Sequence, residues 1–106
     1  MILDTNAPRG RILVVDDDPV LRTMLVVSLC EAGHDVLQAE DGARALDLML
    51  LDKSKNCLPD VLLTDIQMPR LDGIGLLERL AAENIRVPSL VMTAVGDKDT
   101  VVRLLR

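Results

Sequence analysis

The chain has 106 residues, of which 49% are hydrophobic and 27% are charged, and this balance indicates one globular domain without a disordered tract. The net charge of −5 argues against a basic nucleic-acid surface, and no apolar run is long enough to cross a bilayer. Because the chain has no Phe, Tyr or Trp, stacking on nucleotide bases is excluded as well. We therefore expect a cytoplasmic domain with no direct nucleic-acid or membrane partner and with two reduced cysteines, Cys30 and Cys57.

Residues 1–10 show no regular pattern, and we expect a flexible leader there, followed by a single domain at residues 11–106. Within the domain, short apolar runs alternate with apolar residues at helical spacing. The runs predict strands at residues 11–15, 35–39, 60–65 and 87–93. The intervening patterns predict helices that begin near residues 18, 41, 74 and 97, the last of which reaches residue 106.

Local signals mark the ends of these helices. Pro19 suits the first position of the first helix, and Gly33 suits its C-terminal end. Aspartates stand where N-caps are expected, because a carboxylate accepts hydrogen bonds from the free N–H groups of a first helical turn. These caps are Asp18, Asp41, Asp72 and Asp97. In the third helix the apolar spacing predicts an inward face of Ile74, Leu77, Leu80 and Ala81.

The regular alternation of strands and helices determines the expected fold class. It predicts an α/β protein in which a doubly wound parallel sheet carries helices on both faces. The strands are nearly continuous apolar runs, as expected for strands that are covered on both faces. In such open sheets, ligands bind beyond the carboxyl ends of the strands, so the residues at those ends are the candidate functional residues.

Three predicted strands end in polar residues at that edge of the sheet. The first is followed by Asp16 and Asp17, the third ends in Asp65 and the fourth ends in Thr93. Carboxylates at close range raise one another's pKa unless a cation neutralises them, and Mg2+ prefers oxygen ligands. With Mg2+ bound, a carboxylate could attack a phosphorus atom while Thr93 donates a hydrogen bond. A solvated surface remains the simpler alternative for Asp16 and Asp17.

Three motifs resemble one known family, the receiver domains of two-component response regulators. They are ILVVDDDP at residues 12–19, DVLLTDIQMPRLDG at residues 60–73 and PSLVMTA at residues 88–94. The resemblance extends from residue 11 to the end of the chain, and the middle motif is long and specific. It implies a flavodoxin-like fold with the strand order 2-1-3-4.

Carried over by position, the resemblance implies a role for each polar residue at the sheet edge. Asp65 would accept a phosphoryl group from a histidine kinase or a histidine phosphotransfer protein. Asp16, Asp17 and Asp65, with the backbone carbonyl of Gln67, would hold Mg2+. Thr93 would act as the switch hydroxyl that responds to phosphorylation. The domain would then regulate a partner surface and would not be an enzyme with turnover.

The chain departs from the family after the fourth strand. The family's fifth strand and fifth helix are missing, together with the lysine that pairs with the phosphoryl group, and Lys98 is a weak substitute. The fourth strand should then lie at an open edge, and the apolar first helix should lose part of its cover. We expect a homodimer or a strand-exchanged dimer through that edge if the remainder is truly absent.

Two other functions remain open from the sequence. Without the family lysine, the chain could be a receiver-like interaction module that is not phosphorylated. The residues DDDPV at 16–20 also fit the motif of haloacid-dehalogenase-like phosphatases, with Asp16 as nucleophile and Asp18 as acid/base. That alternative leaves the motif around Asp65 unexplained.

Overall fold

The computed structural model describes residues 10–92 and 103–105. Its elements are β1 (Arg11–Val15), α1 (Pro19–Glu31), β2 (Asp35–Ala39), α2 (Gly42–Ser54), β3 (Val61–Asp65), α3 (Gly73–Ala82), β4 (Ser89–Met92) and β5 (Arg103–Leu105). The sheet order is β2-β1-β3-β4-β5, and the pairs among the first four strands are parallel. The predicted α/β sheet with the order 2-1-3-4 is therefore confirmed.

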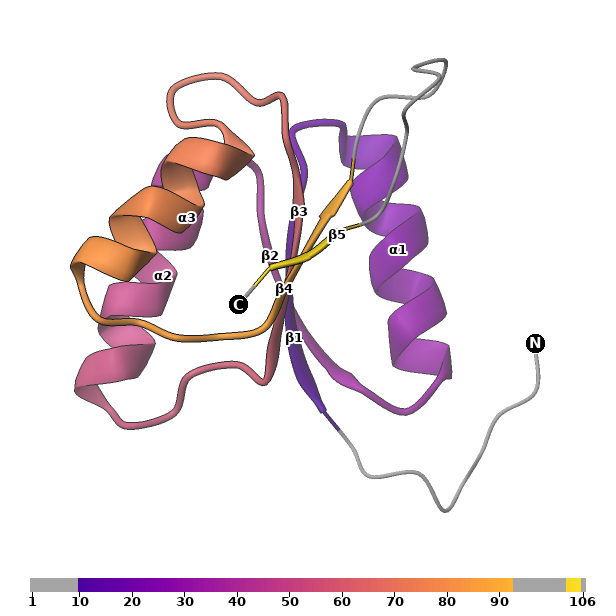
Figure 1. Ribbon diagram of the computed structural model, residues 1–106. Helices are drawn as coiled ribbons and strands as arrows, with labels where there is room; N and C mark the ends of the chain where they lie inside the picture. The colour runs from indigo at the N-terminus through magenta and orange to yellow at the C-terminus, as the bar shows by residue number, and fades with distance from the viewer. Residues whose placement is uncertain (1–9, 93–102, 106) are drawn as a thin grey trace.

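The helices cover both faces of the sheet, as Figure 1 shows. Helices α2 and α3 lie side by side on one face, and α1 lies on the other. The main core lies between the sheet and the α2–α3 pair. It is built from aliphatic side chains and includes Leu13, Ala45, Met49, Leu62, Leu76 and Leu80. By contrast, in the part of the chain that the structure describes, α1 has no buried residue, and Met24 is 61% exposed.

The helix ends follow the local signals in the sequence. Asp18 accepts hydrogen bonds from the backbone N–H groups of Val20 and Leu21, and Asp72 accepts one from Gly75. Asp41 accepts one from Arg44 and caps α2. These three caps are confirmed, while Asp97 lies outside the described residues. Gly33, beyond the C-terminal end of α1, has a φ of +95°, a conformation that glycine adopts at little cost.

The predicted inward face of the third helix is partly wrong. Leu80 is buried as expected, but the other core residue of α3 is Leu76, whereas Ile74 is 43% exposed and Ala81 is exposed. Leu76 and Leu80 form the stripe that faces the core. Ile74 and Ala81 lie on the neighbouring stripe, whereas Leu77 is partly buried and packs against the core, so its predicted inward position is confirmed. Both stripes have helical periodicity, so the spacing alone could not select between them.

The C-terminal prediction also needs correction. A helix was expected to reach residue 106, but Arg103–Leu105 form β5, which pairs antiparallel with β4. A free strand edge carries unpaired N–H and C=O groups, and pairing with β5 satisfies part of that edge. The prediction that the fourth strand lies at an open edge is therefore wrong. The dimer or strand-exchanged dimer expected through that edge loses its structural reason.

Candidate functional site

The carboxyl ends of β1 and β3 bring the predicted acidic residues together. Asp16 and Asp17 directly follow β1, and Asp65 is the last residue of β3, which pairs with β1 in parallel. One carboxylate oxygen from each of the three residues lies within 4.8 Å of the others. The sheet register therefore produces the cluster that the sequence predicted, which we call the acidic cluster.

Asp16 is the most buried member of the acidic cluster, with 1% of its surface exposed. Its Oδ1 accepts a hydrogen bond from the backbone N–H of Asp18 at 2.9 Å. Its Oδ2 is buried and has no hydrogen-bond partner among the described residues. A buried carboxylate oxygen without a partner is costly, because it has lost its water and gained nothing in return. A positive ligand at this oxygen would offset that cost.

The electrostatics of the acidic cluster support the same conclusion. Burial is the largest cause that raises the pKa of Asp65 above its usual range, and the neighbouring charge of Asp16 adds to it. Burial also raises the pKa of Asp16, and hydrogen bonding from the backbone of Asp18 only partly offsets this. Both carboxylates therefore resist ionisation in the absence of a cation, and a bound divalent cation would remove that resistance.

The residues present fit a hard divalent cation. Asp17 is exposed, and it lines an open hollow of about 470 Å3 together with Gln67, Met68, Pro69 and Asp72. The hollow lies beside the acidic cluster and gives a ligand access to it. The donor set consists of oxygen atoms, which Mg2+ prefers, and an open hollow leaves room for the waters that Mg2+ keeps.

Two contacts around the acidic cluster were not predicted from the sequence. The guanidinium of Arg22, on α1, donates a hydrogen bond to the backbone carbonyl of Asp16 at 2.7 Å. A Cβ on Gly73 would lie 2.2 Å from the carbonyl oxygen of Asp65, so only glycine permits the start of α3 to lie against the end of β3. The DG pair at residues 72–73 was a signal for a tight approach, whereas no local pattern pointed to Arg22.

Two of the sequence-predicted residues cannot be placed. Thr93 and Lys98 lie outside the described residues.

Gln67 lies two residues beyond Asp65, at the hollow. Asp18, the acid/base residue in the phosphatase alternative, caps α1 through its Oδ1. The geometry therefore gives that alternative no support.

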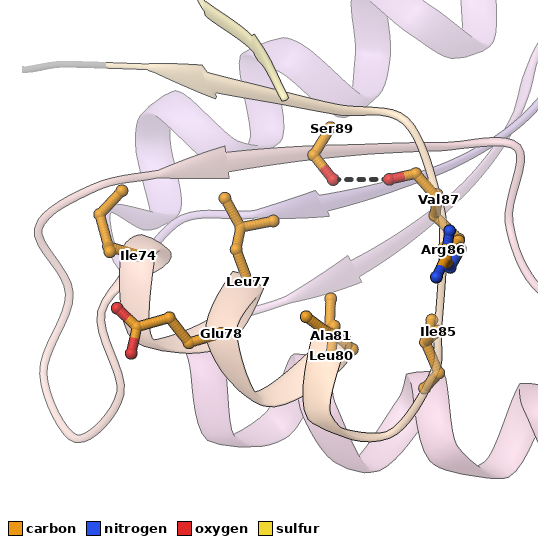
Figure 2. Close-up of a pocket in the computed structure, with 9 residues that line it drawn as sticks. All are labelled: Ile74, Leu77, Glu78, Leu80, Ala81, Ile85, Arg86, Val87 and Ser89. Atoms are coloured by element: carbon orange, nitrogen blue, oxygen red, sulfur yellow. Dashed lines mark hydrogen bonds between the residues drawn. The ribbon is translucent and has the colours of Figure 1, made fainter. Parts of the chain in front are cut away.

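A second and larger hollow lies away from the acidic cluster, between α3 and β4. It has a volume of about 580 Å3, and Figure 2 shows its mainly apolar lining. Ile74, Leu77 and Ala81 line it from α3, and the hydroxyl of Ser89 donates to the carbonyl of Val87 at its far side. It contains no acidic cluster, so the candidate chemistry belongs to the smaller hollow.

The fold and the acidic cluster define an open parallel α/β domain with a group of acids at the carboxyl edge of its sheet that could hold a metal ion. A sequence profile described as "Response regulator receiver domain" matches residues 12–106. The chain belongs to this family: it is a response regulator receiver domain of the kind found in two-component systems. In the part of the chain that the structure describes, no helix is both long and apolar enough to traverse a bilayer.

Curated relatives and solved structures agree with this assignment. Response regulator MprA of Mycobacterium tuberculosis (strain ATCC 25618 / H37Rv) is 44% identical over 84 residues, which make up 79% of this chain and 34% of that protein. The chain thus spans about a third of the length of the curated relatives it matches.

Two solved structures show the same fold. The receiver domain of the Francisella response regulator 1452 aligns with a TM-score of 0.73 and 33% identity, over 86% of this chain and 71% of that one. Vibrio cholerae chemotaxis protein CheY4 aligns with a TM-score of 0.71 and 26% identity, over 87% of this chain and 74% of that one.

Proposed function

We propose that this domain accepts a phosphoryl group on Asp65 from a histidine kinase or a histidine phosphotransfer protein, in a reaction that requires Mg2+. The observation that carries the proposal is the acidic cluster, in which three carboxylates meet within 4.8 Å and Asp65 ends a central strand. A structural role does not require three acids at such close range, because their mutual repulsion opposes it.

Each residue of the cluster has a distinct task in this reaction. A carboxylate oxygen of Asp65 attacks the phosphorus atom of a phosphohistidine, and the P–N bond breaks. The bonding electron pair stays on the imidazole nitrogen, which takes up a proton. Asp16, Asp17 and the carbonyl of Gln67, together with Asp65, would hold Mg2+. When bound, the ion supplies positive charge that offsets the charge on the transferred phosphoryl oxygens.

Three features of the domain support a regulatory role rather than turnover. The family is regulatory in general, and Thr93, the next residue in the sequence after β4, is proposed as the hydroxyl that responds to the phosphoryl group. Asp17 of the acidic cluster lines an open hollow rather than an enclosed pocket. We propose that phosphorylation changes a surface that a partner reads, in the cytoplasm.

The intact mass of the protein tests this proposal. The protein is incubated with Mg2+ and acetyl phosphate, alongside the Asp65→Asn variant and a matched control, Asp60→Asn, at the opposite end of β3. We expect the mass of one phosphoryl group to be added to the parent and to the control, and to be absent from Asp65→Asn or when EDTA is present. A parent that gains no mass would favour the receiver-like module that is not phosphorylated.

A further inference from the structure

The loop between β3 and α3, residues 66–72, contacts the N-terminus of α2 through one buried carboxylate. Asp41 has a side chain that is only 4% exposed, and both of its oxygens have partners. Oδ1 accepts the backbone N–H of Arg44 at 2.8 Å, which caps α2. Oδ2 pairs with the guanidinium of Arg70, also at 2.8 Å. A buried carboxylate is costly unless it is paired, and Arg70, whose side chain is otherwise 71% exposed, supplies the charged partner of Asp41.

The backbone of the same loop lies unusually close to α2. A Cβ on Gly42 would lie 2.2 Å from the carbonyl oxygen of Leu71, so glycine at the first position of α2 permits the approach. Leu71 also packs against the core. The ion pair and the close backbone approach therefore join the same two segments: residues 41–42 at the start of α2 and residues 70–71 of the loop.

The loop conformation at Arg70 is strained. Its φ is +69°, and the backbone N–H of Leu71 donates to the carbonyl of Pro69 at 2.8 Å across it. This is a γ-turn with positive φ, the rarer and more strained form for a residue with a side chain. Such conformations persist where the surroundings fix them, and they gather at functional sites. The contacts with Asp41 and Gly42 are the surroundings that fix this turn.

Gln67 lies in the same loop, three residues before Arg70, and lines the hollow that Asp17 also lines. We infer that Arg70 and Asp41 are positioning residues for the Mg2+ site. Their ion pair fixes the loop so that the carbonyl of Gln67 faces the hollow. This inference rests on the proposed function, because it concerns the proposed Mg2+ ligand. Neither residue would touch the ion itself, and a residue that orients a metal ligand affects the affinity for the metal.

Two measurements on Arg70→Ala, Asp41→Asn and the double variant test this inference. Asparagine can still cap a helix, so Asp41→Asn removes the charge and keeps the cap. Arg70→Lys retains a cation, so it should keep most of the Mg2+ affinity and most of the protection from amide exchange that Arg70→Ala loses. The matched control is Asp52→Asn, because Asp52 is a largely buried acid on the same helix that pairs with Arg11 at the other end of the sheet.

The first measurement is amide hydrogen exchange without metal, at the N–H groups of Leu71 and Gly73, which donate within the loop to Pro69 and Ile66. The second is the Kd for Mg2+ alone, by titration calorimetry. We expect about tenfold faster exchange and about tenfold weaker Mg2+ binding in each single variant, the low end for residues that orient a metal ligand. The double variant should be no worse than either single variant, and Asp52→Asn should match the parent.

The two measurements separate this inference from the proposed function. If Arg70→Ala keeps the parent's exchange rates and binds Mg2+ within twofold of the parent, the inference is wrong. If exchange accelerates but the affinity for Mg2+ is unchanged, the ion pair holds the loop without positioning a ligand, and the inference is also overturned. A parent that binds no Mg2+ at all would overturn the proposed metal site, whatever the exchange rates show.

Discussion

The two ends of the central sheet both gather aspartates, but the partners of those aspartates differ. At the amino end, Arg11 contacts two acids: its backbone N–H donates a hydrogen bond to Asp60 at 2.8 Å, and its guanidinium lies 3.9 Å from the carboxylate of Asp52. At the carboxyl end, Asp16 and Asp65 face other acids, and Oδ2 of Asp16 has no hydrogen-bond partner among the described residues.

The difference distinguishes acids whose partners lie within the chain from acids that we propose bind a cation. At the amino end the charges are compensated within the chain, so these acids contribute to stability and need no ligand. At the carboxyl end the compensation is partial, because Asp16 receives one backbone hydrogen bond while its Oδ2 has no partner among the described residues. We propose that a cation completes it. The same residue type in the same sheet therefore has opposite consequences, which depend on what faces it.

The largest effect is expected from a change in the acidic cluster itself. Asp17→Asn removes one charged oxygen ligand from the proposed Mg2+ site, and we expect Mg2+ binding to weaken by about 100-fold, equivalent to about 2.8 kcal/mol. Titration calorimetry measures this Kd. Asp60→Asn is the matched control at the amino end and should leave the Kd unchanged. An Asp17→Asn Kd within threefold of the parent would contradict the proposed ligand set.

An intermediate effect is expected at the amino end. Arg11→Gln removes the cation beside Asp52 and the hydrogen bond from the guanidinium to the carbonyl of Cys57. We expect the free energy of unfolding to fall by about 1–2 kcal/mol, while Mg2+ affinity stays at the parental value. Urea unfolding followed by circular dichroism measures the first, and calorimetry the second. A change in Mg2+ affinity would show that the two ends are not independent.

The smallest effect is expected on the pH dependence of stability without metal. Because the folded-state pKa values of Asp16 and Asp65 are raised, the folded protein holds these protons more tightly than the unfolded chain. Stability should therefore fall as the pH rises from about 3.8 through the raised pKa values. Asp65→Asn removes one of these charges, so this variant should melt a few degrees above the parent at pH 7 in EDTA. This gap in melting temperature should close as the pH falls toward 4.

Thermal melts across this pH range measure the gap between the parent and Asp65→Asn. Asp35→Asn, a change at an exposed acid, is the control and should show no such gap. A gap that does not change with pH would mean that ionisation of the acidic cluster is not the cause. Saturating Mg2+ should remove the gap or reverse it, because the ion binds and stabilises the folded parent.

Local sequence signals gave the helix caps and most of the strands. Asp18, Asp41 and Asp72 cap their helices as predicted, because a cap depends on N–H groups two or three residues away. The inward face of α3 was assigned partly to the wrong stripe, with Ile74 in place of Leu76. Two adjacent apolar stripes satisfy the same spacing, and only the position of the sheet decides which one is buried.

The candidate site was also predictable in part. Asp16, Asp17 and Asp65 could be grouped from the sequence because parallel strands place their carboxyl ends at one edge. The sequence by itself thus determined the alternating fold, the acidic cluster and the likeness to receiver domains. The tertiary structure alone revealed the pairing of Arg70 with Asp41 and of β5 with β4. It also revealed that one oxygen of Asp16 has no partner among the described residues. These depend on contacts between segments far apart in the chain, which no local pattern encodes.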